Sequence, residues 1–149
     1  MLTLQVFQIS ILTTWRWRAT QNLKLSDSRK QERETMMYYK KDASGYETRI
    51  NGIEQKTLVY GERSLLTEFL LRKGSKIPKH FHPYEQTGYL VSGHMVFLVG
   101  GERYDARAGD SWCILMNVEH SAEVMEDSVA VEVFSPVRED YMPDKKHTA

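Results

Sequence analysis

Residues 74–86 read GSKIPKHFHPYEQ, and this short stretch decides how the whole chain is interpreted. His80 and His82 are separated by one residue, so in an extended strand their side chains point to the same face. A further donor follows four residues later at Gln86, and the adjacent Glu85 is an alternative because a bend interrupts the alternation. The stretch therefore predicts part of a metal site, although a His-x-His pair also occurs by chance.

A third histidine, His120, comes much later in the chain, close to a predicted strand. Three imidazoles and one amide oxygen form a suitable ligand set for a divalent first-row transition metal. The set fits Mn, Fe, Ni, Co, Cu and Zn, so the sequence predicts one such ion without identifying it. Because neutral imidazole is the ligand, metal affinity is expected to fall below about pH 6.5.

Short strands separated by turns account for the chain from residue 46 onward. Segments rich in Val, Tyr, Phe, Leu and Thr predict strands at residues 46–50, 56–60, 63–71, 86–92, 94–100, 110–115, 121–126 and 128–135. Glycine-containing turns lie between them, and no long segment after residue 40 has helical periodicity. This pattern is typical of an all-β sandwich or barrel in a single domain.

The composition excludes several classes of protein. The chain has 149 residues with 20 basic and 20 acidic side chains, so it lacks the net positive charge of a typical nucleic-acid-binding protein. No apolar run approaches the ~20 residues of a membrane-spanning helix. The single cysteine, Cys113, cannot form an internal disulfide, which favours a cytoplasmic protein. We therefore expect no nucleic-acid or membrane partner.

The chain divides into three parts by composition. Residues 1–36 are an N-terminal extension, residues 37–142 form the β-rich domain, and residues 143–149 are a polar tail. In the extension, positive charges follow the apolar stretch, which is the reverse of a secretory signal. The extension is expected to be disordered, to result from an incorrectly assigned start codon, or to cover the barrel or a partner as an extra strand or helix.

The spacing around the first two histidines resembles the first motif of the cupin superfamily. That motif is Gly, five residues, His-x-His, three or four residues, Glu, six residues and Gly. This chain has Gly74, His80, His82, Gln86 and Gly93 at those positions, so every spacing fits and Gln replaces Glu. The replacement removes one negative charge from the predicted metal site.

The spacing around the third histidine resembles the second cupin motif, which is Gly, five residues, Pro-x-Gly, two residues, His, three residues and Asn. The matching residues are Gly109, Leu115, Asn117, His120 and Val124, so the spacing holds while Pro, Gly and Asn are replaced. The resemblance implies a single-domain cupin, that is, a double-stranded β-helix or jelly-roll barrel. It also implies that the metal ligands His80, His82, Gln86 and His120 converge inside one end of this barrel.

Residues 131–141 resemble the last strand and tail of the small KdgF-type cupins of pectin degradation. Those proteins convert 4,5-unsaturated uronates into linear ketonised sugars. The resemblance implies catalytic roles for Glu132, which stands in place of an Asp, and for Phe134 and Arg138. Glu132 would act as a general acid or base, Phe134 would shape the pocket, and Arg138 would bind the substrate carboxylate. No other cofactor-binding residue is predicted.

The orientation of the last strand remains open at this point. Strand alternation alone would turn Val129, Val131 and Val133 inward and expose Glu132 to solvent. The resemblance implies the opposite, with Glu132 and Phe134 inside the barrel.

Fold alone does not determine function. Our first hypothesis is a metal-dependent isomerase-type enzyme that opens the ring of an unsaturated uronate, with a small sugar acid as substrate. The alternatives are an Fe-dependent oxygenase of a small organic substrate and a non-catalytic cupin that senses or binds a small ligand. A homodimer is expected by resemblance, because cupin barrels commonly pair.

Overall fold

The computed structural model describes residues 38–143, so the N-terminal extension and residues 144–149 of the polar tail lie outside the described residues. The elements are β1 (Glu47–Ile50), β2 (Ile53–Tyr60), β3 (Leu65–Leu71), β4 (Lys76–His80), β5 (Glu85–Ser92), β6 (His94–Val99), β7 (Glu102–Arg107), β8 (Ser111–Ile114), β9 (His120–Val124), β10 (Ser128–Ser135) and the short 3-10 helix η1 (Glu139–Tyr141). No helix in this part of the chain is long and apolar enough to cross a membrane.

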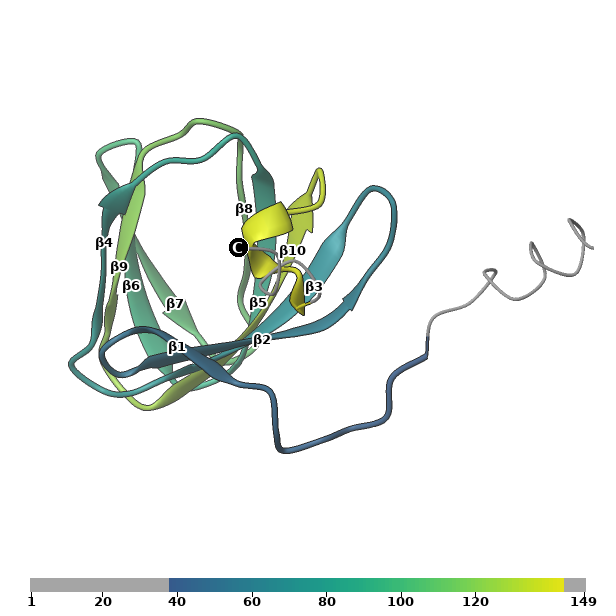
Figure 1. Cartoon of the computed structure of the whole chain (residues 1–149). Coiled ribbons are helices and arrows are strands. Elements are labelled where there is room, and N and C mark those ends of the chain that lie inside the picture. The colour runs from purple at the N-terminus through teal and green to yellow at the C-terminus, as the bar shows by residue number, and fades with distance from the viewer. Residues whose placement is uncertain (1–37, 144–149) are drawn as a thin grey trace, which may run out of the picture. The chain divides into compact units, whose positions relative to one another are not determined.

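The strands form two antiparallel sheets that face each other (Figure 1). One sheet has the order β1-β2-β3-β10-β5-β8, and the other has the order β4-β9-β6-β7. The last strand, β10, lies inside the larger sheet and pairs with both β3 and β5. This arrangement is a jelly-roll barrel, so the predicted all-β fold class is confirmed.

All eight predicted strands are present with small differences at their ends, but two further strands were missed. Both missed strands are the edge strands of the smaller sheet. Five of the six residues of β7 are exposed, all except Ala106, and β4 contains Pro78, which is tolerated at a sheet edge. Edge strands exposed on both faces lack the alternation of apolar and polar residues on which the prediction depends.

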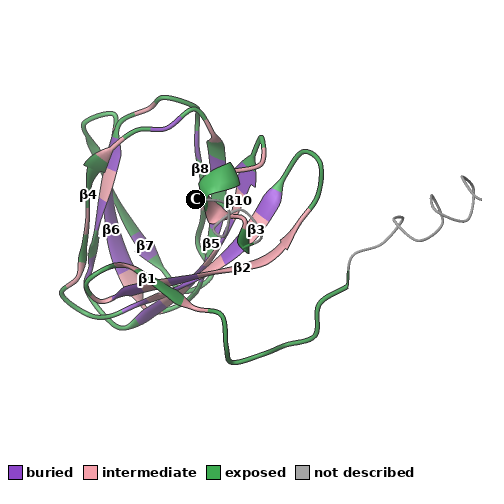
Figure 2. Ribbon diagram, in the orientation of Figure 1, coloured by how far each residue is buried: buried purple, intermediate pink, exposed green. Residues whose placement is uncertain are grey.

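The barrel core comes from strands whose buried residues alternate. Along β3 and β10 every second residue is buried, and the other residues are half-buried or exposed. Figure 2 shows the buried positions recurring along the strands of both sheets. The hydrophobic core includes Ile53, Leu65, Phe69, Leu71, Leu90, Met95, Phe97, Val124, Ala130 and Phe134.

The orientation of β10 follows the cupin resemblance, and the interpretation from alternation alone is wrong. Glu132 and Phe134 are buried, whereas Val131 and Val133 are only half-buried on the outer face. Glu132 pairs with Thr67 of β3, which is fully buried. Alternation failed because the outer face of this sheet is also rich in apolar residues, so the pattern did not distinguish inside from outside.

Candidate metal centre and active site

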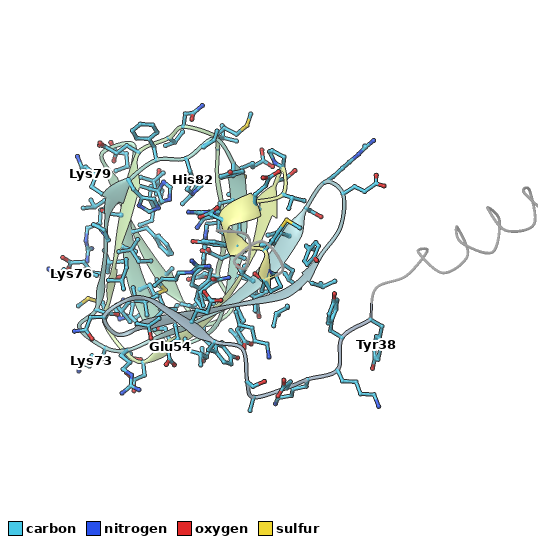
Figure 3. All side chains as sticks on the ribbon, in the orientation of Figure 1. Tyr38, Glu54, Lys73, Lys76, Lys79 and His82 are labelled. Carbon is cyan, nitrogen blue, oxygen red and sulfur yellow. The ribbon has the colours of Figure 1, made fainter. Side chains whose placement is uncertain are left out.

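The three predicted metal-binding histidines meet at one end of the barrel. His80 ends β4 and pairs with His120, the first residue of β9, while His82 lies in the loop that follows β4. One nitrogen of each ring lies within 4.8 Å of the corresponding nitrogens of the other two. In Figure 3, Lys76 and Lys79 project outward from β4, away from His82.

The hydrogen bonds of the histidines determine which nitrogen is available for a metal. Each Nδ1 lies near a backbone carbonyl oxygen, at 2.8 Å for His80 to Pro78, 3.0 Å for His82 to Tyr84 and 2.8 Å for His120 to Val118. A carbonyl oxygen only accepts hydrogen bonds, so each Nδ1 carries the proton and donates it. In the neutral rings every Nε2 is therefore left with a lone pair.

Burial keeps two of these rings in the neutral form that binds metal. Burial is the main cause that lowers the pKa of His82 and His120, and the nearby His80 and Arg138 lower both pKa values further. Nε2 of His120 is buried and has no hydrogen-bond partner among the described residues. An unsatisfied buried lone pair beside two others is costly for a structural cluster but suits a divalent cation. The three histidines therefore fit a transition-metal site.

The structure distinguishes between the two candidates for the fourth ligand. Glu85 is exposed, whereas Gln86 is buried and faces the histidines. Oε1 of Gln86 lies 3.0 Å from Nε2 of His82. Because the proton of His82 is on Nδ1, two lone-pair donors face each other here, an arrangement that a shared cation would satisfy. Gln86 is therefore the better candidate for the fourth ligand.

Gln86 also connects the histidines to the predicted catalytic carboxyl group. Its Nε2 donates a hydrogen bond of 2.8 Å to Oε1 of Glu132. Burial raises the pKa of Glu132 to about 7, although the amide of Gln86, the indole N–H of Trp112 and the charge of Arg138 each act to lower it. A carboxyl group with this pKa can donate or accept a proton near neutral pH.

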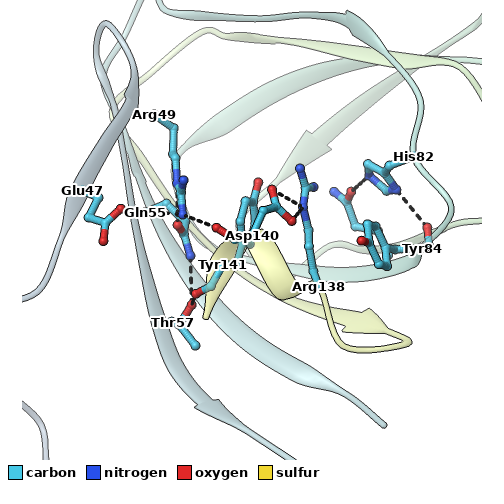
Figure 4. A network of polar contacts seen from close by, with 10 residues as sticks. Glu47, Arg49, Gln55, Thr57, His82, Tyr84, Arg138, Asp140 and Tyr141 are labelled. Atoms are coloured by element: carbon cyan, nitrogen blue, oxygen red, sulfur yellow. Dashed lines mark hydrogen bonds and ion pairs between the residues drawn. The ribbon is translucent and has the colours of Figure 1, made fainter. Parts of the chain in front are cut away.

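The segment after β10 brings a cluster of aromatic and cationic side chains next to the histidines (Figure 4). Nε of Arg138 donates to both carboxylate oxygens of Asp140 at 3.1 and 3.2 Å, and its guanidinium carbon lies 3.9 Å from the ring centre of Tyr141. Arg49 of β1 lies 4.7 Å from the centre of the same ring. Arg49 was missed because it belongs to no motif of the sequence, and Tyr141, although it ends the stretch 131–141, was assigned no role because only the fold brings its ring here.

Most of these groups line one cavity of about 230 Å³. Of the seven predicted site residues, the cavity is lined by His80, Gln86, His120, Glu132, Phe134 and Arg138, and His82 does not line it. Its apolar wall includes Ile53, Phe69, Leu71, Met95 and Phe97. The cavity thus combines a metal-ligand set, a buried carboxyl group and a guanidinium group on an apolar background, which is typical of a small-molecule site.

The loops that carry the histidines are linked through the backbone. The N–H of Asn117 donates a hydrogen bond of 2.8 Å to the carbonyl oxygen of His82. Asn117 has a φ of 61° and occupies the position of the second-motif glycine. Asparagine tolerates this left-handed conformation better than other non-glycine residues, so the replacement noted in the sequence preserves the turn.

Comparison with known proteins agrees with this geometry. Residues 67–136 match the family model described as a cupin domain. KdgF from Halomonas sp. is 24% identical, with a TM-score of 0.69, over 72% of this chain and 100% of that chain. An RmlC-like cupin from Shewanella frigidimarina NCIMB 400 is 24% identical, with a TM-score of 0.68, over 72% of this chain and 97% of that chain. Comparison with curated protein sequences gives no match.

More distant structural neighbours catalyse other chemistry. The polyketide cyclase RemF from Streptomyces resistomycificus is 20% identical, with a TM-score of 0.59, over 74% of this chain and 96% of that chain. The neighbours also include the nucleoside dehydratase Pac13. At these identities the similarity establishes the fold, and the reaction has to be inferred from the site itself.

Proposed function

We propose that this chain, a small cupin that resembles KdgF, is a metal-dependent enzyme that opens the ring of a 4,5-unsaturated uronate. One observation carries the proposal. A buried glutamate with a pKa raised to about 7 is hydrogen-bonded to Gln86, which contacts the three-histidine cluster, and Arg138 lines the same cavity. The resemblance of residues 131–141 to KdgF-type cupins supports this choice of substrate.

The reaction is an isomerisation that needs a proton to move but requires no oxidant or reductant. The bond between the ring oxygen and the anomeric carbon breaks, and the anomeric carbon becomes an aldehyde as its hydroxyl loses a proton. The ring oxygen stays on C5 and becomes the oxygen of a ketone, and C4, the other carbon of the former double bond, gains a proton. Glu132 is placed to carry such a proton, because its raised pKa allows both protonation states near neutral pH.

Arg138 is the proposed partner of the substrate carboxylate. Asp140 engages its Nε, so the terminal Nη groups are the part of the guanidinium group that a ligand would meet. A guanidinium group binds a carboxylate through two parallel hydrogen bonds and would fix the orientation of the ring. The buried ring of Phe134, whose centre lies 5.8 Å from that of His82, would exclude water from the reacting carbons.

The metal would be held by His80, His82, His120 and Gln86. When bound, such an ion would polarise sugar oxygens and orient the ring. The cavity volume of about 230 Å³ is below the roughly 300–1,000 Å³ of typical drug-sized sites, which favours a single sugar unit.

The test combines metal analysis with an absorbance assay. We would purify the protein without a histidine tag, quantify bound metals, and follow the ultraviolet absorbance of unsaturated galacturonate and mannuronate monomers. The proposal predicts bound metal and a loss of absorbance that chelation abolishes and metal restores. The Arg138→Lys variant should raise KM more than it lowers kcat, because lysine keeps the charge and loses the two-pronged geometry.

Two results would overturn the proposal. Bound metal without turnover of either monomer would exclude this substrate class, and oxygen uptake with Fe(II) would then be measured to test an oxygenase. A protein that takes up no metal after reconstitution would exclude metal-dependent catalysis, which would favour a cupin that only binds a small ligand.

A further inference from the structure

Three residues that are distant in the chain lie in one row across the larger sheet. Trp112 of β8 pairs with Gly88 of β5, and Gly88 pairs with Glu132 of β10. Residues paired in this way project to the same face of a sheet. Since Glu132 faces the barrel interior, the indole of Trp112 is directed to the same side.

The glycine in the middle of this row is required for space. A Cβ atom at Gly88 would lie 2.2 Å from Cε2 and 2.5 Å from Nε1 of Trp112. Gly88 and Gly61 are the two described glycines without a positive φ, so backbone conformation does not explain Gly88. The indole therefore lies directly against the backbone of Gly88, and any side chain there would displace it.

The indole N–H of Trp112 has no partner at full hydrogen-bonding geometry. Nε1 is buried, and no acceptor among the described residues meets both the distance and the angle of a well-formed hydrogen bond. Buried indole N–H groups usually have a partner, so its position needs an explanation. Packing does not supply one, because contact with Phe97, at a ring-centre distance of 4.7 Å, would be equally good for an aromatic ring without a donor.

Glu132 is the acceptor that this donor can reach. The carboxyl group accepts a hydrogen bond from Gln86 at Oε1, which leaves Oε2 for a second donor. The indole N–H of Trp112 is also close enough to this carboxyl group to act on it as a hydrogen-bond donor.

We propose that Trp112 is a positioning residue whose indole N–H donates a hydrogen bond to the carboxyl group of Glu132. The absence of a side chain at Gly88 leaves the space that the indole occupies in this arrangement. Gln86 and Trp112 then hold the carboxyl group from two sides and prevent rotation of its plane. A fixed plane directs the proton-carrying oxygen of Glu132 to the reacting carbon. The catalytic consequence rests on the proposed function, whereas the hydrogen bond itself does not.

The hydrogen bond can be tested by nuclear magnetic resonance without any substrate. The chain contains three tryptophans, and the indole N–H resonance of Trp112 is the one that the Trp112→Phe variant lacks. We expect Glu132→Ala to move this resonance upfield and to speed its exchange with solvent. The control is Thr67→Val, because the hydroxyl of Thr67 donates to the backbone carbonyl of Glu132 rather than to its carboxyl group. An unchanged resonance in Glu132→Ala would overturn the proposal.

Two glycine variants test the same proposal independently of the tryptophan substitution. Gly88→Ala should displace the indole and change the Trp112 resonance as Glu132→Ala does. Gly61→Ala is the matched control, since a Cβ there would meet nothing within 4 Å. If Gly88→Ala folded and left the resonance unchanged, the assigned role of Gly88 would be wrong.

Measurements of enzyme activity distinguish a positioning role of Trp112 from a packing role. Trp112→Phe keeps an aromatic ring and removes the donor, so it should lower kcat about tenfold with little change in KM or metal content. A change in KM or metal content with kcat preserved would instead assign Trp112 a packing role. If no uronate were turned over by the wild-type protein, the resonance measurements would still decide whether the hydrogen bond exists.

Discussion

The two ends of the barrel interior are built from the same strands but differ in polarity. β9 begins at the polar end with His120 and finishes at the apolar end with Val124, and β5 runs likewise from Gln86 to Leu90. The apolar end is filled by residues such as Leu90, which is fully buried. The polar end buries His82, Gln86, His120 and Glu132, and Nε2 of His120 has no hydrogen-bond partner among the described residues.

Because of this difference, we expect one end of the barrel to contribute mainly to stability and the other mainly to function. Burial of aliphatic side chains favours folding, whereas burial of imidazole and carboxyl groups opposes it unless they are paired. The apolar end should therefore supply the stability that the polar end lowers. Substitutions at the two ends are expected to have different consequences, and the following predictions test that separation.

The largest effect is expected for removal of a predicted metal ligand. His120→Ala should reduce metal affinity by at least about 100-fold, because it removes one of three converging Nε2 lone pairs. Metal content after dialysis is the measurement. His94→Ala is the matched control, since that histidine lies outside the cluster and contacts Asp105. Full metal content in His120→Ala would show that the cluster is not the metal site.

The next effect concerns catalysis without metal loss. Glu132→Gln should lower kcat by about 10²–10⁴-fold, the usual contribution of a general acid or base, because the amide cannot exchange a proton. Gln86 can still donate to the new side-chain oxygen, so metal content should not change. Turnover at the wild-type rate would remove Glu132 from the mechanism.

At the apolar end the expected change is in stability alone. Leu90→Ala should reduce the free energy of unfolding by about 2–5 kcal/mol, because it leaves a cavity in the core. Urea titration measures this loss, and metal content in the folded protein should be retained. Leu98→Ala, at a half-exposed position, is the control and should change stability by less than about 0.5 kcal/mol. Equal losses of unfolding free energy in Leu90→Ala and Leu98→Ala would contradict the view that the apolar end supplies the stability.

A smaller effect is expected in the pH dependence of the metal-free protein. The pKa of Glu132 is raised from 4.5 to about 7, so its contribution to stability is complete below pH 4.5 and is lost as the pH rises through 7. The loss amounts to at most about 3 kcal/mol. His82 and His120 have lowered pKa values, so their contribution is present above pH 6.5 and is lost as the pH falls.

Comparing the wild type with the Glu132→Gln variant separates the effect of Glu132 titration on stability from the effect of the histidines. Between pH 5 and pH 8, Glu132→Gln should gain stability relative to the wild type, because only the wild type must ionise a buried carboxyl group. Urea midpoints of metal-free samples measure the difference. Parallel pH profiles for the two proteins would mean that Glu132 does not titrate as described.

Much of the fold and part of the site could be predicted from the sequence. The motif spacing predicted that His120 lies near the first two histidines, and composition and turn residues predicted most of the strands. Alternation alone gave the wrong face for Glu132, because Val131 and Val133 make the outer face of β10 equally apolar. Arg49, Tyr141 and the contact of Trp112 with Gly88 could not be predicted, since they depend on which strands become neighbours.

The pairing of His80 with His120 across β4 and β9 also has a consequence for how the protein matures. These residues are far apart in the chain, and forming such non-local pairs is typically a slow part of folding. A nascent chain that has not yet made β9 holds only two of the three imidazoles. A metal ion that needs all three imidazoles would therefore bind only after the barrel has closed, and it would slow unfolding of the folded protein rather than guide its assembly.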